Sequence, residues 1–99
     1  GLDLLARNFG TRFGELDLVM RDRNVLVFVE VRYRARDRYG DGAASITAAK
    51  RSRLAIAAEQ YRLANPRHAA LPCRFDVVSL SGDEQTPRIE WLRNAFEAS

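Results

Sequence analysis

The sequence predicts a single α/β (α+β) domain in which one helix crosses between strands of a small mixed β-sheet. Three strand-like segments precede the long helical stretch of the chain, and two more follow it. A helix between two strands of one sheet forms a crossover and normally covers one face of that sheet. Because 99 residues with 46% hydrophobic content suffice for one core, we expect residues 1–99 to form one domain.

Residues 2–12 open with an apolar run that predicts the first strand. Gly10 and Gly14 flank Phe13, and closely spaced glycines of this kind mark turns. We therefore expect the chain to turn there, so that the first strand runs antiparallel to the second.

Residues 13–34 have the pattern of a β-hairpin, with a short polar connection between two apolar, β-branched strands. The predicted connection is Arg21-Asp22-Arg23-Asn24. Because side chains alternate between the two faces of a strand, each strand divides into two sets. The first strand carries Glu15, Asp17 and Val19 on one face and Leu16, Leu18 and Met20 on the other. The second carries Leu26, Phe28, Glu30, Arg32 and Arg34 on one face and Val25, Val27, Val29, Val31 and Tyr33 on the other.

The parity of the connection decides whether the acidic residues of this hairpin meet. An even number of residues pairs Met20 with Val25 or a near neighbour and brings Glu15, Asp17, Glu30 and Arg32 to one face, whereas an odd number separates the acids. Carboxylates on opposite or diagonal positions lie roughly 5–8 Å apart, which suits a divalent cation. Since Asp17 and Glu30 stand within apolar runs, a metal or phosphate site is favoured. A solvated or internally salt-bridged face is the alternative.

The segment from Ala35 to Gly42 is rich in charge and glycine, which is typical of a flexible loop. We expect it to lie close to the acidic face, with Arg36 and Arg38 available for phosphate groups. An exposed loop with incidental charge explains the same residues equally well.

A helix is predicted from Ser45 to about Ala64, with Ser45 or Thr47 as its cap and Asn65-Pro66 as its end. The core-facing residues recur at steps of three and four. They are Ile46, Leu54, Ala57 or Ala58, and Tyr61.

Lys50 falls on the core-facing stripe of this helix. It is the only lysine in the sequence, which contains fifteen arginines. A lysine in that place either extends to the protein edge or meets an anion, so an ion pair and a role in the site both remain open. We expect Arg51 and Arg53 to face outward, where they extend a basic surface.

After a connector, residues 73–80 predict a further strand, and residues 88–96 predict a last strand with Trp91 and Phe96 as packing residues. Asp76 in the first of these segments either joins the acidic cluster or pairs with an arginine, and we favour the pairing. Cys73, the lone cysteine, is expected to be a small buried hydrophobe.

The formal net charge is +3 and arginine provides most of the positive charge. Arginine suits phosphate recognition, so DNA or another anionic partner is consistent with the composition, as is a coding bias towards arginine. Neither a membrane-spanning stretch nor a signal-peptide pattern is present in the sequence, so we expect a cytoplasmic protein without a membrane partner.

Five ordered blocks of the chain resemble the bacterial YraN-like family, which is uncharacterised. The blocks are Gly14-Glu15-Leu16-Asp17-Leu18, Val27-Phe28-Val29-Glu30-Val31-Arg32, Lys50 with Arg53-Leu54, Arg74-Phe75-Asp76-Val77-Val78, and Asn94-Ala95-Phe96. This resemblance covers nearly the whole chain. It implies a restriction-endonuclease-like fold of the PD-(D/E)XK superfamily, similar to archaeal Holliday-junction resolvases.

The resemblance also implies roles for individual residues. Asp17 and Glu30 match the two metal-binding acids, and Glu15 is an additional acid of the family, so that Mg²⁺ or Mn²⁺ is expected at these three residues. The superfamily lysine two residues after the second acid is replaced by Arg32, which binds phosphate but cannot act as a base. Lys50 is then expected to supply the missing ammonium group.

The resemblance implies a helix at the start of the family's domain, and we expect this sequence to begin after it. Without that helix one side of the sheet is expected to be exposed, which favours a homodimer.

The resemblance thus implies a metal-dependent DNA endonuclease acting on branched or structured DNA. Its expected catalytic residues are Asp17, Glu30, Arg32 and Lys50, and its expected nucleic-acid contacts are Arg34, Arg36, Arg38, Arg51 and Arg53. A nucleic-acid-binding module that has lost cleavage, or a protein-assembly domain, are the alternatives.

Overall fold

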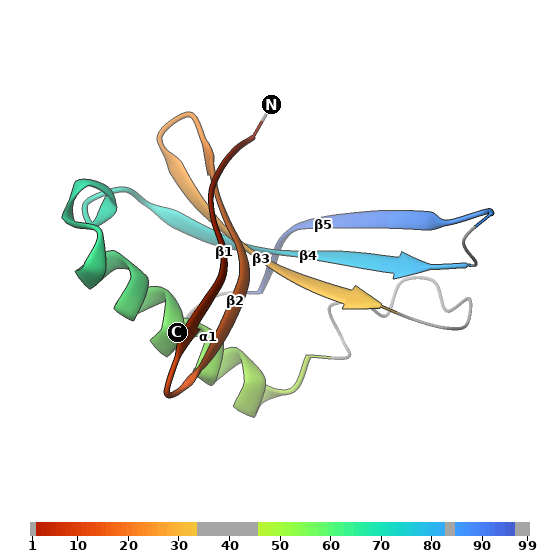
Figure 1. Cartoon of the computed structure of the whole chain (residues 1–99), viewed down its shortest axis with the longest axis horizontal. Coiled ribbons are helices and arrows are strands. Elements are labelled where there is room, and N and C mark those ends of the chain that lie inside the picture. The colour runs from red at the N-terminus through yellow and green to blue at the C-terminus, as the bar shows by residue number, and fades with distance from the viewer. Residues whose placement is uncertain (1, 34–45, 83–84, 97–99) are drawn as a thin grey trace.

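The computed structural model describes residues 2–33, 46–82 and 85–96 and contains a five-stranded sheet with one long helix against it (Figure 1). The strands are β1 (Asp3–Thr11), β2 (Gly14–Asp22), β3 (Val25–Tyr33), β4 (Cys73–Ser81) and β5 (Arg88–Phe96). The helix is α1 (Ala48–Ala64), and a short 3₁₀ helix (Pro66–His68) follows it. None of the helices in these ranges has the length and apolar content needed to cross a lipid bilayer.

The strands lie in the order in which they occur along the chain. β3 and β4 are parallel, and the other neighbouring pairs are antiparallel. The parallel pair requires a crossover, which α1 provides. The prediction of a small mixed sheet with a crossover helix is therefore confirmed.

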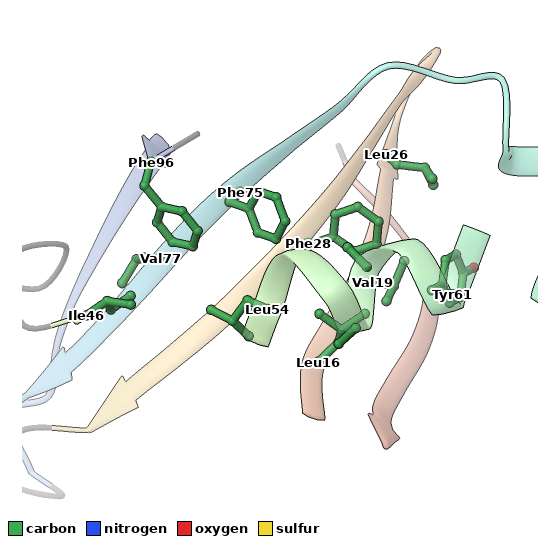
Figure 2. Close-up of a cluster of buried hydrophobic side chains, with 12 residues drawn as sticks. Leu16, Val19, Leu26, Phe28, Ile46, Leu54, Tyr61, Phe75, Val77 and Phe96 are labelled. Atoms are coloured by element: carbon green, nitrogen blue, oxygen red, sulfur yellow. The ribbon is translucent and has the colours of Figure 1, made fainter. Parts of the chain in front are cut away.

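The main core lies between the sheet and α1 (Figure 2). Leu54 and Tyr61 of α1 pack against side chains of the central strands, among them Phe28 and Phe75. A smaller apolar cluster, built on Val27, Val29 and Val78, lies on the other face of the sheet. Burial on one side of α1 explains the three- and four-residue spacing in its sequence.

The ends of α1 agree with the expected capping signals. The Thr47 side chain accepts a hydrogen bond from the backbone N–H of Lys50 at 3.1 Å, so Thr47 is the N-cap. The helix ends at Ala64, one residue before Asn65-Pro66. Ser45, the other candidate cap, and the segment from Ala35 to Gly42 lie outside the described residues.

The connection between β2 and β3 contains two residues, Arg23 and Asn24, since Asp22 pairs with Val25. It is two residues shorter than predicted, but its number is still even. Met20 therefore faces Val27, a near neighbour of the predicted partner, and the expected parity of the two strands holds.

The predicted alternation along β2 is wrong at one place. Leu16 and Val19 both belong to the core beneath α1, whereas Leu18 packs on the opposite face of the sheet. The last registered β2–β3 pair is that of Leu18 with Val29, and between the flanking β1–β2 pairs Asn8 has a left-handed φ of 49°. Beyond this point β2 follows β1 alone and curls over the helix (Figure 1), so its faces rotate relative to the sheet.

Asp76 pairs with an arginine, as favoured from the sequence. It is fully buried, and its Oδ1 accepts a hydrogen bond from Arg74 Nε at 3.0 Å. The same oxygen accepts a hydrogen bond from the backbone N–H of Asn94 at 2.9 Å, where φ is 50° and the β4–β5 register shifts. A buried carboxylate thus fixes an irregular step in the outermost strand pair.

Candidate metal centre

Asp17 and Glu30 lie just past the end of the β2–β3 pairing, where the two strands separate. Each is the residue next to the last registered pair of the two strands, Leu18 with Val29. Asp17 Oδ2 accepts a hydrogen bond from the backbone N–H of Val31 at 2.8 Å. A side-chain oxygen therefore takes the place of a backbone acceptor, and this hydrogen bond directs the Asp17 carboxylate towards β3.

Glu30 is only 6% exposed, and the lysine of α1 reaches its carboxylate. Lys50 Nζ lies 3.2 Å from Glu30 Oε1, and 35% of the Lys50 side chain is exposed. The aliphatic part of Lys50 follows the helix stripe while its ammonium group neutralises a buried charge. The placement of this lysine on an inward stripe is explained by the ion pair.

The second oxygen of the Glu30 carboxylate, Oε2, has different surroundings. Among the described residues, the buried atom Oε2 has no hydrogen-bond partner. Burial raises the pKa of Glu30, the nearby negative charge of Asp17 raises it further, and the Lys50 ammonium opposes both effects. A buried carboxylate oxygen without a partner favours an added proton or cation.

The donor set fits a hard cation that keeps part of its water shell. Mg²⁺ is often held by one or two carboxylates, with water and substrate phosphate completing its coordination. Asp17 and Glu30 provide two carboxylates of this kind, and Glu30 Oε2 is the orphaned atom. Within residues 2–33, 46–82 and 85–96 there is no group of three or more His, Cys, Asp or Glu side chains arranged for a metal.

Glu15 does not join this pair as a third acid. Its side chain is exposed, and its partner in the β1–β2 pairing is Gly10. The β2–β3 pairing ends at Leu18 with Val29, so the part of β2 that carries Glu15 pairs with β1 alone.

The basic residues named from the sequence have different surroundings. Arg32 is half-buried on β3, in register with Ser79 of β4. Arg53 is exposed on α1, as expected. The expectation for Arg51 is wrong, because its guanidinium lies 5.4 Å from the centre of the Phe96 ring, a cation–π distance, and its Nε is buried. The remaining predicted contacts, Arg34, Arg36 and Arg38, lie outside the described residues.

Two features of the site were not found from the sequence. The Val31 N–H that orients Asp17 is a backbone group, and no residue pattern marks the place where two strands separate. The sequence contained one indication of the network around Asp76, namely an acidic residue between the apolar residues Phe75 and Val77. Its hydrogen-bond partner Trp91 was assigned only to packing.

Fold and site together define a class of small mixed α/β domains in which two strand carboxylates lie beside a helix lysine. Residues 1–80 match the model described as "Uncharacterised protein family UPF0102". The chain belongs to this family, and the YraN-like resemblance is confirmed at that level.

Curated relatives agree with this assignment. A UPF0102 protein of Xanthomonas oryzae pv. oryzae is 56% identical over 98 residues, covering 99% of this chain and 79% of the relative. A UPF0102 protein of Nitrosomonas europaea is 52% identical over 98 residues, covering 99% of this chain and 80% of the relative. A UPF0102 protein of Nitrosococcus oceani is 49% identical over 96 residues, covering 97% and 77%.

Proposed function

We propose that this domain is a metal-dependent DNA endonuclease with a restriction-endonuclease-like, PD-(D/E)XK fold, acting on branched or structured DNA. The observation that carries the proposal is the buried Glu30 carboxylate, which lies beside Asp17 and has one oxygen paired with Lys50 and one without a partner. An arrangement that serves only stability gains little from a buried acid next to a second acid.

Asp17 and Glu30 would hold the cation, and the oxygen-only donor set favours Mg²⁺ or Mn²⁺. When bound, such an ion lowers the pKa of a water molecule and stabilises negative charge on a phosphate. Glu15 is exposed, and no group of three or more His, Cys, Asp or Glu side chains among the described residues is arranged for a metal, so we assign Glu15 no direct contact with the ion.

The chain's own residues supply the remaining functions. The Val31 N–H holds the Asp17 carboxylate in one orientation. Lys50 brings an ammonium group to the edge of the acid pair, where it also faces solvent and can contact a phosphate oxygen. Arg32 offers a guanidinium for phosphate but takes no proton, because a guanidinium is always charged in proteins.

A nucleic-acid-binding module without cleavage is the second candidate. Arg32 in place of a lysine favours this alternative. The ion pair between Lys50 and Glu30 favours it too, because it already engages one oxygen of the Glu30 carboxylate. Two acids near a phosphate backbone count against it, because binding alone would gain from their loss.

A calorimetric titration with Mg²⁺ and Mn²⁺ tests the proposal, with the Asp17→Asn, Glu30→Gln double variant as control. We expect binding by the wild type that disappears in the control, together with metal-dependent cleavage of a branched DNA. If the wild type binds no metal at millimolar concentration, with or without DNA, cleavage is excluded as its function. If metal binds but branched, single-stranded and duplex DNA all stay intact, the module without cleavage is the correct alternative.

A further inference from the structure

A groove lies on the face of the sheet opposite α1, away from the acid pair. It consists of two adjoining hollows of about 270 Å³ and 580 Å³ that share Asp22, Arg74 and Arg93. Trp91 lines the first hollow and Arg23 the second, so the groove runs from β5 to the β2–β3 turn. Residues 70 positions apart along the chain therefore form one surface, which the proposed metal chemistry does not use.

Trp91 gives this groove a fixed aromatic surface. Its Nε1 donates a hydrogen bond to Asp76 Oδ2 at 2.8 Å, and Asp76 is itself held by Arg74 and the Asn94 N–H. The edge of the indole is thus anchored to a fully buried carboxylate, yet 41% of Trp91 remains exposed. An anchored indole with free area loses little conformational entropy when a flat ring stacks on it.

The arginine on the floor of the groove is paired with aspartates, whereas those on its rim are largely exposed. Arg74 lies on the floor, between Asp76 at 3.0 Å and Asp22 at 3.3 Å. Arg93 lies on the rim with 69% of its side chain exposed, and its Nη2 is 3.8 Å from Asp22 Oδ2. Arg23 is exposed at the turn. Asp22 contacts two arginines at once, so the rim presents a net positive charge to solvent.

We propose that this groove binds a single strand of nucleic acid, with one base stacked on Trp91 and backbone phosphates on Arg93 and Arg23. An exposed aromatic surface beside spaced cations is the combination that single-strand binding requires. A duplex is disfavoured, because its bases are already stacked and cannot reach an indole. The site goes beyond the proposed nuclease function, since it lies on the other face of the sheet and needs no metal.

The single tryptophan of the chain makes the proposal directly measurable. Intrinsic fluorescence is followed while an oligothymidylate of about 12 nucleotides is added in EDTA at low salt. We expect saturable quenching, and an affinity that falls with salt as expected for release of about 1–2 counterions. The Arg93→Ala variant is expected to bind about 5- to 10-fold more weakly, whereas Arg67→Ala, an exposed arginine of the 3₁₀ helix, is the unchanged control.

Anisotropy of a labelled oligonucleotide extends the test to Trp91→Leu, which we expect to lose about 10-fold or more in affinity through lost stacking. The proposal would be overturned by no binding at low salt, by binding that Arg93→Ala and Trp91→Leu leave unchanged, or by equal affinity for the matched duplex. Equal affinity for thymidine monophosphate would also overturn it, because Arg23 would then contribute nothing. Since EDTA removes divalent metal, failure of the nuclease proposal does not affect these results.

Discussion

At the scale of single residues, the electrostatics of the site depend mainly on the protonation state of Glu30. Burial and Asp17 both favour the protonated form of Glu30, and Lys50 favours the ionised form. Because the pKa is raised in the folded state, the folded chain binds more protons than the unfolded chain above the ordinary pKa of the group. Its contribution to stability therefore falls as pH rises through the raised pKa.

Replacing Lys50 with methionine tests this balance. The Lys50→Met variant leaves an uncompensated buried carboxylate, so we expect a loss of about 1–3 kcal/mol of unfolding free energy at pH 7, less than for a fully buried pair because Lys50 is partly exposed. The loss should shrink as pH falls and Glu30 takes up its proton. Chemical denaturation across pH measures it, and the Lys50→Met, Glu30→Gln double variant should recover most of the stability. A loss that is independent of pH would contradict the assignment.

Arg32 is the second residue whose chemistry can be separated from metal binding. If it contacts phosphate only when charge develops there, Arg32→Ala should lower the cleavage rate about 100-fold while metal affinity stays the same. Arg32→Lys keeps a cation and should retain most of the rate. Single-turnover cleavage and calorimetry together make this distinction, and a parallel loss of metal affinity would show that Arg32 organises the acid pair instead.

At the scale of elements, the hairpin and the helix could be predicted because their signals are local. The alternation of apolar residues predicted both strands, and the even number of residues in their connection predicted which faces pair. Thr47 and Asn65 marked the limits of α1. Lys50 was recognised as an inward residue because the helix repeat is regular. These features depend on neighbours within a few positions along the chain.

The features that could not be predicted depend on long-range contacts. The position where β2 leaves β3 decides that Glu15 is exposed while Asp17 turns to Val31, and it is fixed by packing over α1. The inward position of Arg51 depends on Phe96, 45 positions later in the sequence. The ion pair of Arg74 with Asp22 spans 52 positions. Alternation within one segment carries no information about such partners.

The β4–β5 pair provides a prediction at this scale. Asp76→Asn keeps the shape of the side chain but removes the charge that holds Arg74, so we expect a loss of about 2–4 kcal/mol of unfolding free energy. Asp22→Asn, the matched control on the partly exposed side of Arg74, should cost about 1 kcal/mol or less. Urea denaturation measures both variants. Equal losses would mean that Asp76 acts only as another surface partner of Arg74.

At the scale of the whole molecule, α1 covers one face of the sheet, and no helix of the described residues packs on the other face. The shortest dimension of the domain is 20 Å. On the face away from α1, Tyr33, Leu80 and Ile89 stand in one row across three strands, since Leu80 pairs with both of the others. Tyr33 is 72% and Ile89 68% exposed.

This row leads us to propose the homodimer expected from the sequence, with the row of one copy against the row of another. Exposed apolar side chains in register across neighbouring strands form a flat surface that a two-fold axis can make self-complementary. Ile89→Glu should therefore convert the dimer to monomer in sedimentation velocity, because the two introduced charges would face each other. Leu63→Glu, at an equally exposed leucine of α1, should leave the dimer intact. A monomeric wild type at about 100 μM, a concentration at which a dimer of micromolar Kd is populated, or dissociation by Leu63→Glu alone, would contradict this arrangement.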